Sequence, residues 1–190
     1  MPLALRSAGM SQLVIREATL DDADAVARTS AESWRSSYRG LLPDVTLDGI
    51  DVAKRAAKRR AIVAKREGVH LVACGPLSEI VGFCDAGPCR DDVPRTGEIY
   101  ALYLIERVKR RGLGAELFDR ACTWLREREL HALRVWVLVN NQPARRFYEA
   151  LGGIAGDTKQ KMIGETPVTE QAYVWDDAVI AQRIIATRRR

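Results

Sequence analysis

The sequence contains few of the residues that build metal sites and disulfide frameworks. Its 190 residues include two histidines and four cysteines, and no two cysteines form a C-x-x-C pair (Cys74, Cys84, Cys89, Cys122). A zinc site would therefore have to be assembled from scattered residues. We interpret the cysteines as buried, reduced thiols, which are typical of a cytoplasmic protein. We expect a cytoplasmic location and no metal cofactor.

The sequence also has no apolar run long enough to span a membrane, and its first residues are too short and interrupted for a signal peptide. We expect a loose leader over residues 1–11, one domain over residues 12–175 and a basic tail over residues 176–190. The net charge is +5, and Arg188–Arg190 supply three of these charges. This excess is too small for a dedicated nucleic-acid binder but suits an anionic cofactor. No membrane or nucleic-acid partner is expected.

Hydrophobic periodicity predicts alternating strands and helices. The expected strands cover residues 13–17, 70–75, 79–87, 97–105, 133–139, 157–164 and 168–175. The expected helices cover residues 19–40 and 51–66, start again near residue 112, and cover residues 141–152. In the third helix the apolar side chains fall four residues apart, as on one helix face (Leu113, Leu117, Ala121, Leu125). The order β-α-α-β-β-β-α-β-α-β-β predicts an α/β (α+β) domain with a mixed sheet.

The stretch "RVKRRGLGAEL" (Arg107 to Leu117) combines four basic residues with two glycines at the start of a helix. The first turn of a helix has backbone N–H groups without partners, and the helix dipole is positive there. Gly112 and Gly114 lack the Cβ atoms that would keep an anion from these groups. The spacing excludes a P-loop, and a Rossmann fingerprint would need glycine in place of Leu117. An anion site is predicted; a basic loop before a glycine-tolerant helix start is the alternative.

Two motifs resemble those of the GNAT acetyltransferase family. The segment Lys109–Gly114 matches the [Q/R]-x-x-G-x-[G/A] pattern at the start of that family's central helix, with lysine in the first position. A second pattern, N-x-x-A-x-x-F-Y-x-x-x-G, is met in full (Asn141, Ala144, Phe147, Tyr148, Gly152). The resemblance covers roughly residues 12–175.

The resemblance implies a single domain with a mostly antiparallel sheet that splays between its fourth and fifth strands. It implies an enzyme that uses acetyl-CoA as co-substrate and transfers the acetyl group to an amine. The expected contacts to the CoA pyrophosphate come from one loop (Lys109, Arg110, Arg111, Gly112, Leu113, Gly114, Ala115). The expected contacts to pantetheine come from a strand and from a helix cap (Leu102, Tyr103, Leu104, Asn141).

The reaction needs a proton acceptor for the amine and a proton donor for the leaving thiolate. Tyr148 is the predicted acid, because the resemblance points it at the CoA sulfur; a purely packing role is the alternative. Glu98 is the predicted base, acting directly or through a water, with Glu32 as a second candidate. The alternative for Glu98 is a carboxylate that is solvated or paired with Arg95. No cysteine has a histidine in a recognisable pairing, so direct transfer in a ternary complex is expected.

The amine acceptor cannot be identified from the sequence. Glu32, Trp34 and Tyr38, all on the first predicted helix, are candidates for its binding site. The basic helix of residues 54–66 is interpreted as a solvated face, with binding of an acidic substrate or partner as the alternative. Two other functions remain open: a non-catalytic acyl-CoA-binding module and a nucleic-acid-associated basic protein. A homodimer is also open, because dimers are common in the family.

Overall fold

The computed structural model describes residues 13–177, 179–180 and 183, so the predicted leader and most of the predicted tail lie outside the described residues. The strands are β1 (Val14–Glu17), β2 (Val69–Cys74), β3 (Ile80–Pro88), β4 (Thr96–Leu104), β5 (Ala132–Leu138), β6 (Ile154–Ile163) and β7 (Thr166–Trp175). The helices are α1 (Ala23–Tyr38), α2 (Asp44–Asp48), α3 (Val52–Lys65), α4 (Leu113–Arg126) and α5 (Gln142–Ala150), with 3-10 turns η1 (Leu20–Asp22) and η2 (Glu106–Val108). The short α2 lies where the sequence predicts only a turn.

The strands form one seven-stranded sheet in the order β1-β2-β3-β4-β5-β7-β6. Neighbouring strands run antiparallel except β4 and β5, which are parallel and joined by the α4 crossover. The parallel pairing covers only Thr96–Ile99 against Ala132–Val135. Beyond these residues the two strands separate, which confirms the predicted splay of the sheet between its fourth and fifth strands.

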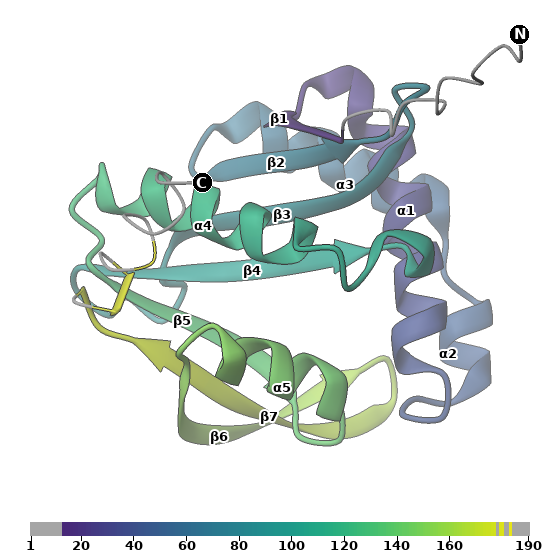
Figure 1. Cartoon of the computed structure of the whole chain (residues 1–190). Helices are drawn as coiled ribbons and strands as arrows, with labels where there is room; N and C mark the ends of the chain where they lie inside the picture. The colour runs from purple at the N-terminus through teal and green to yellow at the C-terminus, as the bar shows by residue number, and fades with distance from the viewer. Residues whose placement is uncertain (1–12, 178, 181–182, 184–190) are drawn as a thin grey trace, which may run out of the picture.

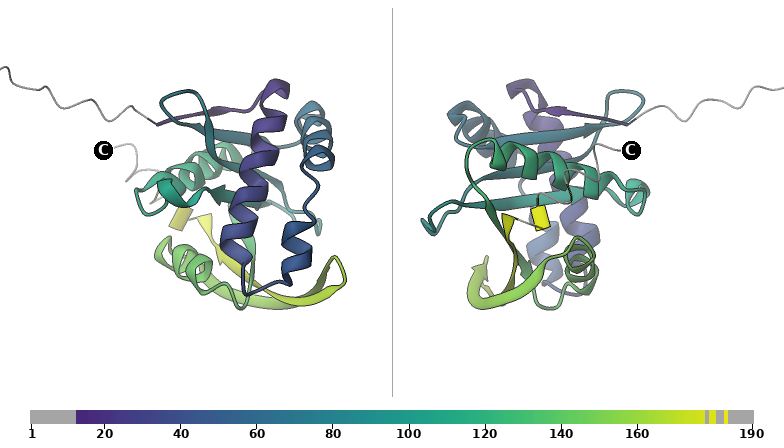
Figure 2. Two further views of the ribbon diagram at one scale, coloured as in Figure 1. Left: turned by 90° about the vertical axis from the view of Figure 1, so that its right-hand side faces the viewer. Right: turned by 60° about the vertical axis from the view of Figure 1, so that its left-hand side comes forward.

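The helices cover the sheet in two layers. In Figure 1, α4 and α5 lie in front of the sheet, while α1 and α3 lie behind it; the left view of Figure 2 shows α1 and α2 from the side. The larger core lies under α4, whose predicted apolar face is confirmed, with Leu117 and Ala121 fully buried against the sheet. On the other face, Val26 of α1 packs with Val72 and Phe83.

A β-bulge in β4 decides which side chains face each layer. Asp85 of β3 pairs with Ala101, but Ala86 pairs with Ile99, so Tyr100 is an extra residue. Ile99 packs into the core under α4, whereas Ala101 packs into the cluster under α1. After the bulge, Leu102 and Leu104 face α4, and Tyr103 faces α1.

Helix α3 is not a purely solvated basic face. Lys54 and Lys58 are exposed, as expected. Arg55 and Arg59, four residues apart on one helix face, turn inward instead and lie over the rings of Trp34 and Phe83. The sequence interpretation is therefore wrong for these two arginines, because their long apolar stems can cover aromatic surface while the charge finds another partner.

Arg59 belongs to a buried ion cluster that ties α3 to the sheet. Its guanidinium pairs with the Asp85 carboxylate, which also lies 2.8 Å from Nδ1 of His70. Burial alone would raise the pKa of Asp85, but the hydrogen bonds from His70 and Arg59 lower it overall. Since the pKa is lower in the folded state, the cluster stabilises the fold above the unfolded value near pH 3.9.

We expect Asp85→Asn to lower the free energy of unfolding at pH 7 by about 3 kcal/mol, because it leaves the buried guanidinium of Arg59 without its counter-charge. The difference from wild type should shrink as the pH falls below about 4, because the unfolded carboxylate is protonated there, and the folded one, whose pKa is lower, is protonated at still lower pH. Urea unfolding at several pH values measures both effects. Asp48→Asn is the control, because its ion pair with Arg39 is exposed and contributes little. Equal stabilities of the two variants would contradict the cluster's role.

Candidate functional site

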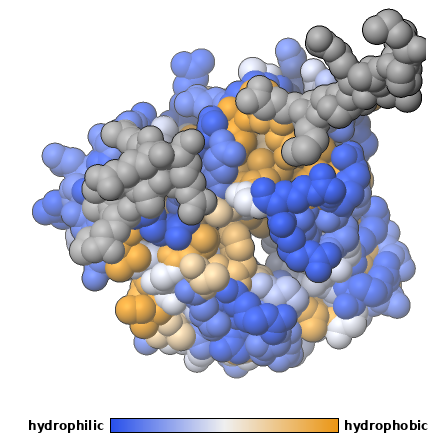
Figure 3. Space-filling view, in the orientation of Figure 1, coloured by the Kyte–Doolittle hydropathy of each residue, from blue (hydrophilic) through white to orange (hydrophobic). Residues whose placement is uncertain are grey.

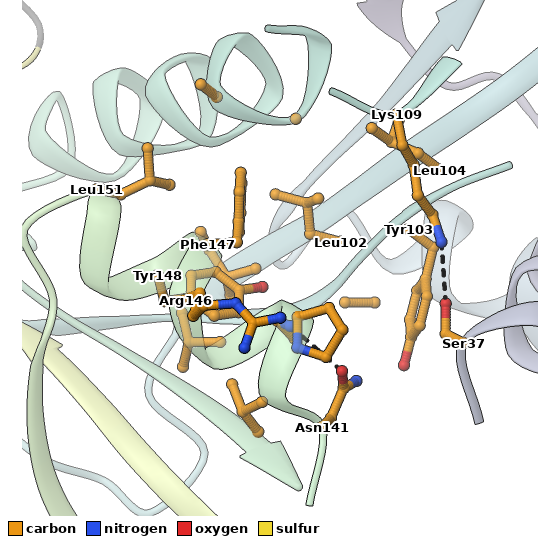
Figure 4. Close-up of a pocket in the computed structure, with 18 of the residues that line it drawn as sticks. Ser37, Leu102, Tyr103, Leu104, Lys109, Asn141, Arg146, Phe147, Tyr148 and Leu151 are labelled. Atoms are coloured by element: carbon orange, nitrogen blue, oxygen red, sulfur yellow. Dashed lines mark hydrogen bonds between the residues drawn. The ribbon is translucent and has the colours of Figure 1, made fainter. Parts of the chain in front are cut away.

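A cavity of about 900 Å³ opens where β4 and β5 separate. Its walls come from α1, β4, the loop before α4, β5 and α5. Figure 3 shows this face hollowed near its centre, with apolar side chains beside hydrophilic ones, and Figure 4 shows the side chains that line the hollow. The cavity exists because the edges of β4 and β5 are unpaired beyond Ile99 and Val135.

The loop before α4 supplies a row of free backbone N–H groups at the mouth of this cavity. Lys109 donates its N–H to the carbonyl of Glu106, and Glu116 donates to Gly112 at 3.0 Å. Among the described residues, no N–H group from Arg110 to Ala115 has a hydrogen-bond acceptor. Arg110 and Gly112 have left-handed backbones, with φ of 59° and 84°. The loop therefore presents the donors and positive dipole end that bind anions.

The two glycines of this loop have different roles. The positive φ of Gly112 favours glycine over other residues, although a Cβ at this position would meet no atom within 4 Å. A Cβ on Gly114 would lie 3.3 Å from the ring of Phe147 in α5. Gly114 thus makes room for Phe147, which differs from its predicted role of clearing the backbone for an anion.

The basic side chains of the loop also differ from one another. Lys109 is half-buried and lies 2.8 Å from Glu106 and 3.4 Å from the Ser37 hydroxyl (Figure 4). Arg110 lines the cavity, but Arg111 is exposed outside it. Leu113, also in the predicted set, is buried in the core with its backbone N–H at the helix start.

The edge of β4 that faces the gap has unpaired backbone groups at two positions. The Ile105 N–H donates to the Val81 carbonyl at 3.0 Å, which fixes the side of β4 that pairs with β3. Because backbone groups alternate along a strand, Tyr103 also pairs with β3, while Leu102 and Leu104 direct theirs into the gap. Of the three predicted backbone contacts, two are therefore directed into the cavity.

Asn141 caps α5 as predicted. It is buried, lines the cavity, and accepts a hydrogen bond from the Ala144 N–H at 3.2 Å through its side-chain oxygen. Sequence reasoning missed Arg146, an exposed lining residue on the same helix. Its position next to Phe147 of the second motif is the signal that could have identified it.

Tyr148 is buried to 6% exposure and lines the cavity from α5 (Figure 4). Its ring packs against Phe147 and Phe118, so it also belongs to the core. The hydroxyl has no hydrogen-bond partner within the described part of the chain, and burial raises the pKa of Tyr148 above its usual value. The packing and functional interpretations of this tyrosine are thus compatible.

Glu98 does not line the cavity, although it stands on β4 only four residues before Leu102. It is 1% exposed, and its carboxylate pairs with the guanidinium of Arg90 and accepts the Arg90 backbone N–H at 3.2 Å. Arg134 of β5 lies 3.9 Å away. One alternative role that the sequence suggests for Glu98 is an ion pair with Arg95. An ion pair is present, but its partner is Arg90.

The predicted acceptor residues are only partly brought together. Tyr38 lines the cavity, and its hydroxyl lies 3.0 Å from that of Tyr103. Trp34 lies behind Tyr38, with ring centroids 5.1 Å apart, and does not line the cavity. Glu32 is exposed and is also absent from the lining, so its predicted position facing the cleft is wrong.

The described residues contain no group of three or more histidine, cysteine, aspartate or glutamate side chains placed to hold a metal ion. Within the same residues, no helix is long and apolar enough to cross a membrane.

Comparison with known proteins identifies the family of this chain. Residues 27–153 match the model of the acetyltransferase (GNAT) family. The chain belongs to this family. An uncharacterized N-acetyltransferase of Bacillus subtilis, YuaI, is 31% identical over 139 residues, covering 73% of this chain and 78% of YuaI. An uncharacterized N-acetyltransferase of Archaeoglobus fulgidus is 31% identical over 140 residues, covering 70% of this chain and 88% of the relative.

Solved structures share the GNAT fold at low sequence identity. The PaiA N-acetyltransferase of Thermoplasma acidophilum, in complex with coenzyme A, matches with a TM-score of 0.70 at 18% identity, covering 86% of this chain and 99% of PaiA. YncA of Salmonella typhimurium, with its cofactor acetyl-CoA, matches with a TM-score of 0.67 at 17% identity, covering 88% of this chain and 95% of YncA.

We expect Ala115→Asp to weaken the binding of coenzyme A roughly 10- to 100-fold, because a carboxylate would repel a diphosphate held by the free N–H groups. Aspartate in the first turn of a helix is favourable, so the melting temperature should not fall. Ala115→Asn has the same shape without the charge and should bind coenzyme A nearly as wild type does. Calorimetric titration measures the affinities. Equal affinities of the two variants would show that no anion binds at this loop.

Proposed function

We propose that this GNAT family member is an acetyl-CoA-dependent N-acetyltransferase that transfers the acetyl group directly to an amine. The observation that carries the proposal is one continuous cavity that joins free N–H groups at the start of α4 to the unpaired edge of β4. The free N–H groups at the start of α4 fit a diphosphate, and the unpaired edge of β4 fits an extended arm that carries the thioester. The donor molecule thus enters from the face covered by α4 and α5.

The edge of β4 supplies the electrostatic part of the mechanism. The amine nitrogen attacks the thioester carbonyl carbon, and negative charge develops on the carbonyl oxygen. The backbone N–H of Leu102 or Leu104 faces the gap and stabilises this oxyanion, which is worth more in a cavity that excludes water. The remaining groups of these two residues pair with pantetheine as an added strand would.

Tyr148 is the proposed acid. When the tetrahedral intermediate collapses, the carbon–sulfur bond breaks, the thiolate takes the phenolic proton, and the phenolate regains a proton from solvent as the CoA thiol leaves. Burial raises the pKa of Tyr148, so the hydroxyl stays protonated until the thiolate forms. Its free hydroxyl on the cavity wall is also the feature that a non-catalytic acyl-CoA-binding module would not need.

Glu98 is the proposed proton acceptor, acting through water. A direct contact between the Glu98 carboxylate and the amine is not expected, because this carboxylate pairs with Arg90 and does not line the cavity. The Arg90 side chain is 57% exposed, whereas Glu98 is almost fully buried in the sheet. We therefore propose that water molecules carry the proton from the amine to Glu98.

A nucleic-acid-associated protein is the weaker alternative. Two of the arginines of α3 turn inward rather than toward solvent, which reduces the basic surface that such a protein would use.

The test of the proposed acetyltransferase function is amine-dependent release of the CoA thiol from acetyl-CoA, with the acetylated product identified by mass. Binding of acetyl-CoA without turnover on any amine would favour the non-catalytic module.

We expect Tyr148→Phe to lower kcat by roughly 10- to 1000-fold while the KM for acetyl-CoA stays nearly constant. The lost hydroxyl acts only as the thioester breaks, and the phenyl ring keeps its packing. Steady-state kinetics on the best amine provide the measurement. Tyr173→Phe is the control, since that core hydroxyl bonds to Glu149 and Arg145 and does not line the cavity. A higher KM with unchanged kcat would make Tyr148 a binding residue only.

We expect Glu98→Gln to reduce kcat/KM about 10²- to 10⁴-fold near pH 7, with a smaller loss at high pH, where more of the amine is unprotonated. Arg90→Gln breaks the same ion pair but leaves the carboxylate in place, so it should retain most of the activity. Rate–pH profiles of both variants separate the base from the ion pair. Equal losses that do not change with pH would assign Glu98 a structural role.

A further inference from the structure

Two inward-facing arginines of α3 differ in one respect that matters for function. Arg55 and Arg59 lie over the rings of Trp34 and Phe83, at 4.5 and 4.8 Å from the ring centroids. Arg59 has the carboxylate of Asp85 as its counter-charge. Arg55 donates to the Ser30 hydroxyl at 2.6 Å and has no carboxylate partner among the described residues.

A second arginine without a carboxylate partner among the described residues is close enough for its charge to act on Arg55. Arg35 of α1 is half-buried and donates through Nε to the Leu47 carbonyl at 3.2 Å, and it too forms no ion pair within the described residues. Burial, together with the neighbouring charge of Arg35, lowers the pKa of Arg55. A partly buried arginine that feels a second positive charge is unfavourable unless an anion offsets both charges.

Neither arginine lines the cavity; both lie on the α1 and α3 side of the sheet, behind two tyrosines that do line it. Trp34, over which Arg55 stacks, contacts Tyr38 and Tyr103, and both tyrosines line the cavity. Tyr103 faces the α1 layer, whereas Leu102 faces α4 and the free N–H groups of the α4 loop. The pair is therefore separated by the sheet from the place proposed for the diphosphate, and it serves a different anion.

We propose that Arg55 and Arg35 bind an oxyanion of the acceptor, so that the acceptor is a primary amine that also carries a carboxylate or a chemically similar group. This inference rests on the proposed acetyltransferase function and names its substrate class. Guanidinium groups bind carboxylates through two parallel hydrogen bonds, and four of the five N–H donors of Arg55 remain for this contact. The aromatic rings of Tyr38 and Tyr103, which line the cavity, would pack against the carbon chain between the two groups.

The test is a series of ω-amino acids, from glycine to 6-aminohexanoate, each compared with its own carboxamide. The carboxamide keeps the amine and the chain length and removes only the negative charge. We expect kcat/KM to favour the acid by about 10- to 100-fold at the chain length that spans the site. The KM for the acceptor should carry this preference, while the KM for acetyl-CoA stays constant.

Arg55→Met keeps the apolar stem over Trp34 and removes the charge, and it should abolish the preference for the acid. Arg35→Met should reduce it, and Lys58→Met, an exposed cation of the same helix, should leave it intact. Loss of the buried charge should not lower the melting temperature, which separates this effect from unfolding.

Three outcomes decide the matter. A preference for the acid that disappears in Arg55→Met supports the inference. Equal turnover of acids and carboxamides at every length, or a preference that survives in Arg55→Met, overturns it while leaving the acetyltransferase proposal standing. Absence of acetyl-CoA binding or of turnover on any amine overturns the proposed function itself, and the inference with it.

Discussion

The separation of β4 from β5 is the constraint on which the site depends. Parallel pairing ends at Ile99 and Val135, and beyond them two strand edges would be left with unpaired backbone groups in the middle of a sheet. Such groups are costly unless a partner satisfies them. A ligand that pairs with the β4 edge supplies this partner, so the same feature that weakens the empty sheet provides the driving force for binding. The bulge at Tyr100 sets which side chains flank that edge.

One packing contact couples the anion loop to the proposed acid. The ring of Phe147 lies against Gly114, so that α5 approaches the first turn of α4 as closely as a missing side chain allows. Tyr148 follows Phe147 directly and packs on Phe118 of α4. The free N–H groups and the Tyr148 hydroxyl are therefore held in one rigid arrangement by core packing, as a site that must position two ends of one molecule requires.

The sequence predicted the features that depend on local spacing. The apolar face of α4, the Asn141 cap and the helix start at Gly112 all arise within a few residues of chain. It did not predict features that depend on how distant elements meet. The partner of Glu98 is Arg90, across a turn whose geometry no local pattern specifies. Arg55 and Arg59 lie one helical turn apart but have different partners. Arg59 pairs with Asp85 of β3, whereas Arg55 donates to Ser30 of α1, and no local pattern predicts this difference.

Charge is distributed so that two anions can be held on opposite faces of one sheet. The α4 loop offers backbone donors with Lys109 and Arg110, while the α1 layer offers Arg35 and Arg55. Two anionic molecules entering by one face would repel each other, and the repulsion would grow as water is excluded. Entry from opposite faces separates their charges by the thickness of the sheet while their reactive ends meet in the gap. In the proposed arrangement, the splayed sheet would separate the charged ends of the two substrates and bring together only the thioester and the amine.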